Sequence, residues 1–331
     1  MDQNKTNIPN ISPNPKALQT TFRLQTHCTG VLAHTRSPRG KKAYAIYDIC
    51  QWPQDANITV YALLHVLLDF TEQLPEVLYL QLDNAGNQNK NRYVLGFCAF
   101  LVENRIFRKV SINFLPVGHT HEDVDQFFSR IASQLRKTGA GSIPDLLEAT
   151  RNCMDLNPST FFLEAMHDVK SWILPQLNEL HGHRDPHCFK FVLNDQNKCT
   201  MYYRNWTSDL WCSEDKATIV LKSIPNGVPQ LVVPSMDKVE PERLRRSIPQ
   251  FKPWISCAAW DHWEEFLESA LPNLATVSAD NNWPLSTIKA ASDRRRVERS
   301  EGNLDDENME GARMLEEMLD EERVAVEVAT P

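Results

Sequence analysis

The chain has 331 residues, 42% of them hydrophobic and 24% charged, so it is long enough for one large domain or two ordinary ones. No apolar run reaches the roughly 20 residues that a membrane helix needs, and the first residues lack the apolar centre of a signal peptide, so we expect an intracellular protein with no membrane partner. The net charge of −8 comes from residues 301–331, which carry 11 acidic and 2 basic residues; the nearly neutral remainder neither indicates nor excludes nucleic-acid binding.

The first part of the chain predicts an opening hairpin followed by a helix. Residues 1–20 are rich in Asn and Pro, which favours irregular structure. Residues 22–34 and 43–50 have the composition of strands, and the turn residues between them predict a hairpin. Asn57 is the predicted N-cap of a helix over residues 58–72, in which apolar residues recur with the helical period.

The next predicted elements alternate between strand and helix: a strand over 77–82, a helix over 92–105, a strand over 110–115 and a helix over 122–136. The first of these strands ends at Asp83. The last helix opens with Glu122, Asp123 and Asp125. Two strands therefore deliver acidic residues at or just beyond their ends.

The C-terminal half changes character along its length. Ser142 is the predicted cap of a helix over 143–153, and a further helix is predicted over 159–177. Residues 187–272 predict a small, mainly β subdomain with strands over 189–193, 200–204, 217–222 and 230–234, closed by helices over 241–248 and 260–270. Residues 273–331 are a polar linker and an acidic tail, which we expect to be disordered.

The order of the elements predicts the fold class. Alternating strands and helices indicate an α/β protein, and the opening hairpin makes the sheet mixed. Over residues 21–180 this is the order of the ribonuclease H-like fold with its first strand missing. In that fold three acidic residues converge; Asp83 matches the second of them, and the cluster Glu122, Asp123 and Asp125 matches the third.

Two motifs resemble a particular family. They are an Asp-Asn before a Gln-Asn-Lys-Asn run, and a Gly-His-Thr with an Asp five residues beyond the Thr: Asp83, Asn84, Gln88, Asn89, Lys90, Asn91, Gly118, His119, Thr120 and Asp125. The pattern is similar to the transposon-derived, integrase-like DUF7869 family over roughly residues 1–190. Relatives carry a strand and an Asp-Gly before a segment like the present N-terminus, so Asp2 is the candidate substitute for the first acid.

The resemblance implies metal-dependent chemistry on a phosphodiester. Such chemistry uses Mg²⁺ or Mn²⁺ held by hard oxygen ligands on rigid strand and helix ends. Asp83, Asp125 and Asp2 are the candidate metal ligands, and Glu122 or His119 would assist catalysis. Two ordinary explanations stay open: Asp83 could cap a turn, and acidic residues in a first helical turn are favoured by the helix dipole alone.

The loop after Asp83 has two interpretations as well. Amide side chains and one Lys suit contacts to phosphate or sugar, and they equally suit a solvated loop that caps the next helix. The candidate nucleic-acid contacts are Asn84, Gln88, Asn89, Lys90 and Asn91.

Other features carry weaker predictions. The eight cysteines have irregular spacing and no CxxC pair, so we expect reduced thiols. The His- and Cys-rich residues 181–188 match no standard zinc spacing, and we do not expect zinc. Trp206 and Trp211 could stack on bases, although core packing is the commoner role. The run Arg294 to Arg296 resembles a weak nuclear-localisation signal.

Taken together, the residues predict a transposase- or integrase-derived protein whose ancestral activity is Mg²⁺-dependent DNA strand cleavage and transfer. We expect that activity to be incomplete or absent in this chain. The alternative is a non-enzymatic module that binds nucleic acid or protein. DNA is the expected partner, a nuclear location is compatible with the basic run, and the sequence leaves a homo-oligomer open.

Overall fold

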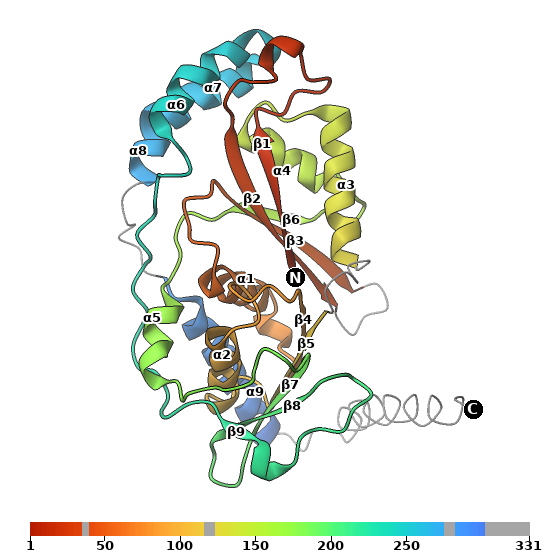
Figure 1. The fold of residues 1–331 in the computed structure, drawn as a ribbon, viewed down its shortest axis with the longest axis vertical. Coiled ribbons are helices and arrows are strands. Elements are labelled where there is room, and N and C mark those ends of the chain that lie inside the picture. Colours follow the sequence, from red (N-terminus) through yellow and green to blue (C-terminus); the bar gives the residue numbers. More distant parts are fainter. Residues whose placement is uncertain (35–39, 116–122, 275–281, 302–331) are drawn as a thin grey trace, which may run out of the picture.

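The computed structural model describes residues 1–34, 40–115, 123–274 and 282–301. Figure 1 shows two groups of strands, one above the other, with helices packed around both. The upper sheet has the order β1-β2-β3-β6, formed by β1 (Asp2–Ile8), β2 (Leu24–His34), β3 (Lys41–Asp48) and β6 (Ser159–Phe162). The lower sheet has the order β4-β5-β7-β8-β9, formed by β4 (Val77–Leu82), β5 (Lys109–Phe114), β7 (Cys188–Leu193), β8 (Cys199–Arg204) and β9 (Thr218–Ile219).

Both sheets are mixed. In the upper sheet β1, β2 and β3 form an antiparallel meander, and β6 joins β3 in parallel. In the lower sheet β4 and β5 are parallel, and β7, β8 and β9 continue antiparallel. The α/β class and the opening hairpin are therefore confirmed. The described strands form two sheets rather than the single sheet expected, and the predicted β-rich segment extends the lower sheet instead of forming its own.

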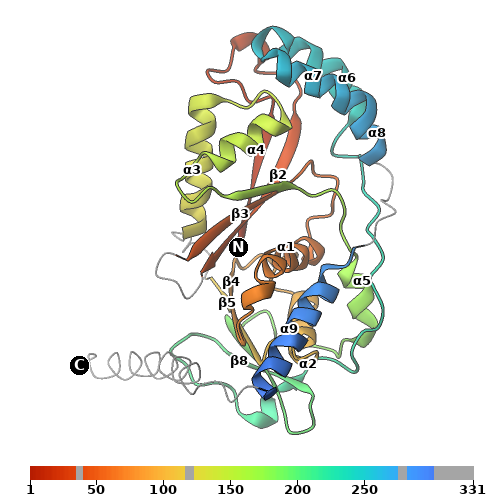
Figure 2. The same ribbon diagram turned by 180° about the vertical axis from the view of Figure 1, so that it is seen from behind.

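The helices divide between the two sheets. The described helices are α1 (Ala56–Asp69), α2 (Arg92–Glu103), α3 (Asp123–Thr138), α4 (Ile143–Arg151), α5 (Val169–Ile173), α6 (Pro241–Ser247), α7 (Cys257–Glu265), α8 (Leu271–Leu274) and α9 (Pro284–Glu301). In both views α1, α2 and α9 lie on one side of the lower sheet, whereas α3 and α4 cover the upper sheet and α6 and α7 lie near its far end (Figures 1 and 2). Within the described residues, no helix is long and apolar enough to cross a membrane.

Helix α1 contributes to the apolar cores of both sheets. Ile58, Ala62 and Val66 pack with Tyr44 and other residues of the upper sheet. The opposite side of the helix, which includes Val60, Leu63, Leu64 and Leu67, belongs to the core of the lower sheet and α2. The N-cap of the helix is Asp55, whose side chain accepts from the main-chain N–H of Asn57 at 2.9 Å. The predicted cap, Asn57, lies inside the first turn instead.

Several predicted elements are wrong, each because distant pairing overrides the local pattern. Residues 1–20 were expected to be irregular, but β1 forms there because it pairs along its whole length with β2. The helix predicted over 159–177 is replaced by β6 and the short α5, since β6 pairs with β3. Residues 230–234 make a single bridge, Leu231 to His167, and no strand.

The polar linker predicted after residue 273 contains α9, which packs on the core of the lower sheet. Trp283, Leu285 and Ile288 are buried against that core. Arg295 ties the helix to the main chain around it: its guanidinium donates to the carbonyl oxygens of Leu74 and Pro75, both at 2.6 Å, and of Ile106 at 3.1 Å. The middle residue of the basic run is thus engaged in packing α9.

A half-buried histidine lies on α1 where the helix meets the upper sheet. The ring of His65 is 4.4 Å from that of Tyr61 and 4.8 Å from that of Phe161, measured between centroids. Its Nε2 is buried and has no hydrogen-bond partner within the described part of the chain. Burial, with a smaller contribution from His167, lowers the pKa of His65 to about 4. The folded protein therefore holds this ring neutral.

Acidification is expected to destabilise the protein through His65. The pKa of a His in an unfolded chain is about 6.5, so the unfolded chain takes up the proton first. The contribution of the neutral ring is complete above about pH 6.5 and is lost as the pH falls toward 4. We expect the free energy of unfolding to fall by about 2 kcal/mol between roughly pH 7 and pH 4.5. Denaturant unfolding of the wild type and of His65→Leu at both pH values measures it; an equal loss in both proteins would contradict the prediction.

Candidate functional site

The carboxylate of Asp83 is held at the end of β4 by two buried side chains. The side-chain amide of Asn89 donates to Asp83 Oδ1. Asn89 is only 2% exposed, and its own oxygen accepts from the hydroxyl of Thr59 on α1 at 2.7 Å. Since Thr59 is buried in a regular helix, this chain of contacts fixes the position of Asp83 relative to the helix. No local sequence pattern marks Thr59 as part of this arrangement.

The rest of the amide-rich loop folds on itself. Asn91 caps α2, because its side-chain oxygen accepts from the main-chain N–H groups of Tyr93 and Val94 at 3.0 and 3.1 Å. The amide nitrogen of Asn91 donates to the main-chain oxygen of Gly86 at 3.2 Å. Asn91 thus caps the helix, as one of the two interpretations of the loop predicts, whereas Asn89 is buried between Asp83 and Thr59. The side chains of Asn84 and Gln88 are half-buried beside them.

Lys90 carries a cation into this loop. The residue is 5% exposed, and its Nζ lies 5.6 Å from the ring centroid of Phe114, the last residue of β5. Burial lowers the pKa of Lys90, and the charges of Asp185 and Cys188 act in the opposite direction. The end of β4 therefore has a fixed carboxylate and the end of β5 a buried amine.

Residues 181–188 pack against the same strand ends. The main chains of Phe114 and His187 pair, with Phe114 N donating to His187 O at 2.7 Å, and the imidazole Nδ1 of His187 lies 3.1 Å from Phe114 O. The ring of Trp206 stacks on His187 at 4.7 Å and is 50% exposed, so the core packing predicted for Trp206 is wrong. The sequence predicts an ordinary loop without zinc for residues 181–188. It does not predict that Asp185 and Cys188 lie near Lys90, because these residues are far apart along the chain.

The start of α3 lies at the tip of the β2–β3 hairpin. Asp123 forms an ion pair with Lys41, and its Oδ2 lies 4.0 Å from Nε2 of His34. The pKa of Asp123 is lowered mainly by the hydrogen bond from Lys41. Asp125, two residues further along the first turn of α3, is half-buried. His119 and Glu122, the other predicted members of this group, lie outside the described residues.

The start of β1 connects the two groups of predicted residues. The amino group of Met1 donates to the main-chain oxygen of Gln81 at 3.0 Å, two residues before Asp83. The main chain of Asp2 pairs with Gly30 of β2. Gly30 faces α3 so closely that a Cβ there would lie 2.7 Å from Cζ of Phe128. The end of β4, the start of β1 and the N-terminal half of α3 therefore lie around the same point between the sheets.

The described side chains do not by themselves make a metal centre. In residues 1–34, 40–115, 123–274 and 282–301, no group of three His, Cys, Asp or Glu side chains has the arrangement needed to hold a metal ion. Asp83 and Asp125 come from the two elements that meet at the start of β1, and both offer hard oxygen ligands of the kind Mg²⁺ prefers. The Mg²⁺ assignment stays a prediction.

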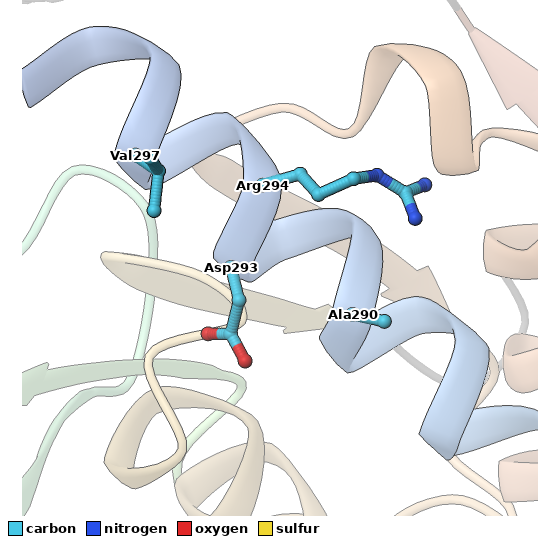
Figure 3. Close-up of a pocket in the computed structure, with 4 residues that line it drawn as sticks. All are labelled: Ala290, Asp293, Arg294 and Val297. Carbon is cyan, nitrogen blue, oxygen red and sulfur yellow. The ribbon is translucent and has the colours of Figure 1, made fainter. Parts of the chain in front are cut away.

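Two surface depressions lie away from these strand ends. One, of about 520 Å³, is lined by Ala290, Asp293, Arg294 and Val297 along a single helix, α9. Figure 3 shows the side chains of Asp293 and Arg294 extending in different directions rather than converging. Binding sites usually combine a concave shape with converging polar groups. We therefore place the candidate site at the ends of β4 and β5.

The fold and the site define an α/β protein with two mixed sheets, in which an acid- and amide-bearing loop lies at the ends of two parallel strands. The chain belongs to the family described as Domain of unknown function (DUF7869), which matches residues 16–209. That match runs from before β2 to just beyond β8 and so includes both strand ends. The predicted family is confirmed. A search of curated proteins found no significant match, and neither did a search of solved structures.

Proposed function

We propose that the chain is a ribonuclease H-like, transposon-derived protein that acts on nucleic acid at the ends of β4 and β5, with Asp83 as a ligand for Mg²⁺ or Mn²⁺. The observation that carries the proposal is the carboxylate of Asp83, immobilised through Asn89 and Thr59 at the end of a strand. Metal ions that activate a phosphodiester need such rigid oxygen ligands.

The surroundings of Asp83 suit a phosphate. Lys90 brings a cation to the neighbouring strand end. Lys90 and Arg92 both lie close enough to His183 for their charges to lower the pKa of its imidazole. Amide side chains of Asn84 and Gln88 can donate to phosphate or sugar oxygens. In this proposal Asp125 is a second metal ligand, because α3 approaches the start of β1 near Asp83.

The second candidate is a module that binds nucleic acid without cleaving it. It requires only the polar and cationic side chains at the ends of β4 and β5, such as Gln88 and Lys90, and no bound metal. Asn89 and Lys90 are compatible with either candidate, because both fix or neutralise charge without taking part in bond breaking.

Nicking of supercoiled DNA by the full chain, with Mg²⁺ or Mn²⁺ present, distinguishes these candidates. We expect Asp83→Asn to lower the rate about tenfold to a hundredfold, since the neutral amide is a poorer ligand for a hard cation. Asp195→Asn, an exposed carboxylate in the turn between β7 and β8, is the matched control and should leave the rate unchanged.

The outcomes separate clearly. Nicking that survives Asp83→Asn would remove Asp83 from the site. Metal-independent binding with no nicking, measured on the same proteins, would favour the non-enzymatic module. If the protein neither bound nor nicked any nucleic acid, both candidate functions would be contradicted.

A further inference from the structure

The lower sheet has one face that the described helices leave uncovered. Helices α1, α2 and α9 all pack on the same side of it, and both views agree that no described helix lies on the other side (Figures 1 and 2). Successive residues of a strand point to opposite faces. The buried series Val110, Ile112 and Phe114 faces the helices, so Lys109, Ser111 and Asn113 face the open side.

The residues on this open face line up in rows across the strands. One row joins Tyr79, Ser111, Lys190 and Tyr202, which are direct neighbours in β4, β5, β7 and β8. Strands lie about 4.8 Å apart, so roughly 14 Å separates the two tyrosines at the ends of the row. The neighbouring row joins Gln81, Asn113, Cys188 and Arg204.

Aromatic rings and cations alternate on the open face. Tyr79 is 54% exposed, and Lys109 Nζ lies 5.9 Å from its ring centroid. Lys190 Nζ lies 4.8 Å from the ring of Tyr202. At the edge, the guanidinium of Arg204 lies 4.4 Å from the ring of Trp211.

The charge of this face has one sign. The side chains that β4, β5, β7 and β8 turn to it include three cations and no carboxylate: Val77, Tyr79, Gln81, Lys109, Ser111, Asn113, Cys188, Lys190, Val192, Thr200, Tyr202 and Arg204. Beside Arg204, the carboxylate of Asp209 accepts from the main-chain N–H of Trp206 at 2.9 Å. Three residues of this face, Ser111, Cys188 and Thr200, are buried, and the ring of Trp211, 4.9 Å from Lys190 Nζ, lies against its β7–β8 side. A polyanion that meets the exposed part, where Tyr79, Gln81 and Asn113 lie, is therefore attracted by Lys109 and Lys190.

We infer that this face, which we call the open sheet face, binds single-stranded nucleic acid. In this inference the bases stack on Tyr79 and Tyr202. The backbone phosphates contact Lys109, Lys190 and Arg204. The exposed amides of Gln81 and Asn113 hydrogen-bond to bases. Cationic surfaces with exposed aromatic rings suit single strands, whose bases are free to stack, better than duplexes. The inference rests on the proposed function, which supplies the class of ligand. It also specifies the substrate of that site as a single strand, because Gln81 on the open sheet face lies only two residues before Asp83.

The test is fluorescence anisotropy of a labelled single-stranded oligonucleotide with the full chain in EDTA, which removes any contribution from metal. We expect Tyr79→Ala to raise Kd about fivefold to a hundredfold, and Tyr79→Phe, which keeps the ring, to bind like the wild type. Trp254→Ala, an equally exposed aromatic residue between α6 and α7, is the control and should not change Kd. Lys190→Gln should reduce the slope of log K against log salt by about 0.7.

Four results would overturn the inference. They are no binding by the wild type at low salt, binding unaffected by Tyr79→Ala, tighter binding of a duplex than of the single strand, and displacement by poly-glutamate as effective as that by unlabelled oligonucleotide. Binding of the oligonucleotide by the wild type in EDTA that depends on Tyr79, without any nicking when Mg²⁺ or Mn²⁺ is added, would support the open sheet face while contradicting the metal site.

Discussion

Asp48→Ala is expected to lower the free energy of unfolding by about 3–5 kcal/mol, because it leaves one member of a buried polar pair without its partner. Asp48 and His27 are both 2% exposed, and Asp48 Oδ2 lies 3.0 Å from His27 Nδ1. The other carboxylate oxygen accepts from the main-chain N–H of Cys50 at 2.7 Å. Nε2 of His27 lies 2.9 Å from the side-chain oxygen of Gln3. The pair thus connects β1, β2 and the end of β3.

Chemical denaturation of a small set of variants tests the cause of that loss. The double variant His27→Leu/Asp48→Leu should recover part of the stability, since neither polar group is then left alone. Asp293→Ala is the matched control: Asp293 forms an ion pair with Arg296 on α9, but both side chains are 43% exposed. Exposed pairs contribute about 0–1 kcal/mol. A loss for Asp48→Ala no larger than that of Asp293→Ala would contradict the prediction.

Trp263→Ala is expected to cost about 3–5 kcal/mol, the usual range for removing a buried large aromatic side chain. Trp263 is 0% exposed and lies on α7 in the core of the upper sheet. Its ring meets that of Phe266 edge to face, with centroids 5.6 Å apart. Its indole N–H donates to the main-chain oxygen of Gly141 at 2.7 Å, so the variant also loses a buried hydrogen bond.

Thermal and denaturant unfolding of Trp263→Ala and Trp254→Ala measure this effect. Trp254 is 51% exposed, and its replacement should change the free energy of unfolding by less than about 0.5 kcal/mol. The comparison holds the residue type constant and varies only burial. Equal losses in the two variants would mean that α7 contributes little to the core of the upper sheet.

Local patterns predicted the elements that carry the site. A buried strand over 77–82 was predicted with the bounds of β4, because an apolar run interrupted only by Gln81 ends at Asp83. The bounds are confirmed, but the burial is wrong: Leu82 is buried, whereas Tyr79 is 54% exposed. Ser142 was predicted to cap α4 and its hydroxyl does so, accepting from Asp145 N at 3.4 Å. In both places the signal lies within a few residues, so no distant contact is needed to find it.

Distant contacts decided the elements that were missed. β6 became a strand through pairing with β3, although its neighbourhood has a helical apolar pattern. The few apolar residues that bury α9, namely Trp283 just before the helix and Leu285 and Ile288 within it, are followed by a basic run, so the sequence pattern of the segment resembles a linker.

For the site, the sequence indicated Asp83 and its loop but not the burial of Lys90. That burial depends on Phe114 and on residues 181–188, which the chain order does not place beside Lys90. Nor did the residues decide whether Asn89 contacts a ligand or a neighbour in the loop. The answer depends on Thr59, on a helix whose packing only the tertiary structure defines.

Helix α1 has one consequence for how the halves of the molecule act together. Thr59, which fixes Asn89 and hence Asp83, stands on the same rigid helix as Ile58 and Ala62, which pack on the upper sheet. A ligand that shifted the upper sheet would displace α1 and so reposition the Asp83 carboxylate without touching it. The same helix would carry a disturbance at Asp83 back to the upper sheet, so the two halves are mechanically coupled in both directions.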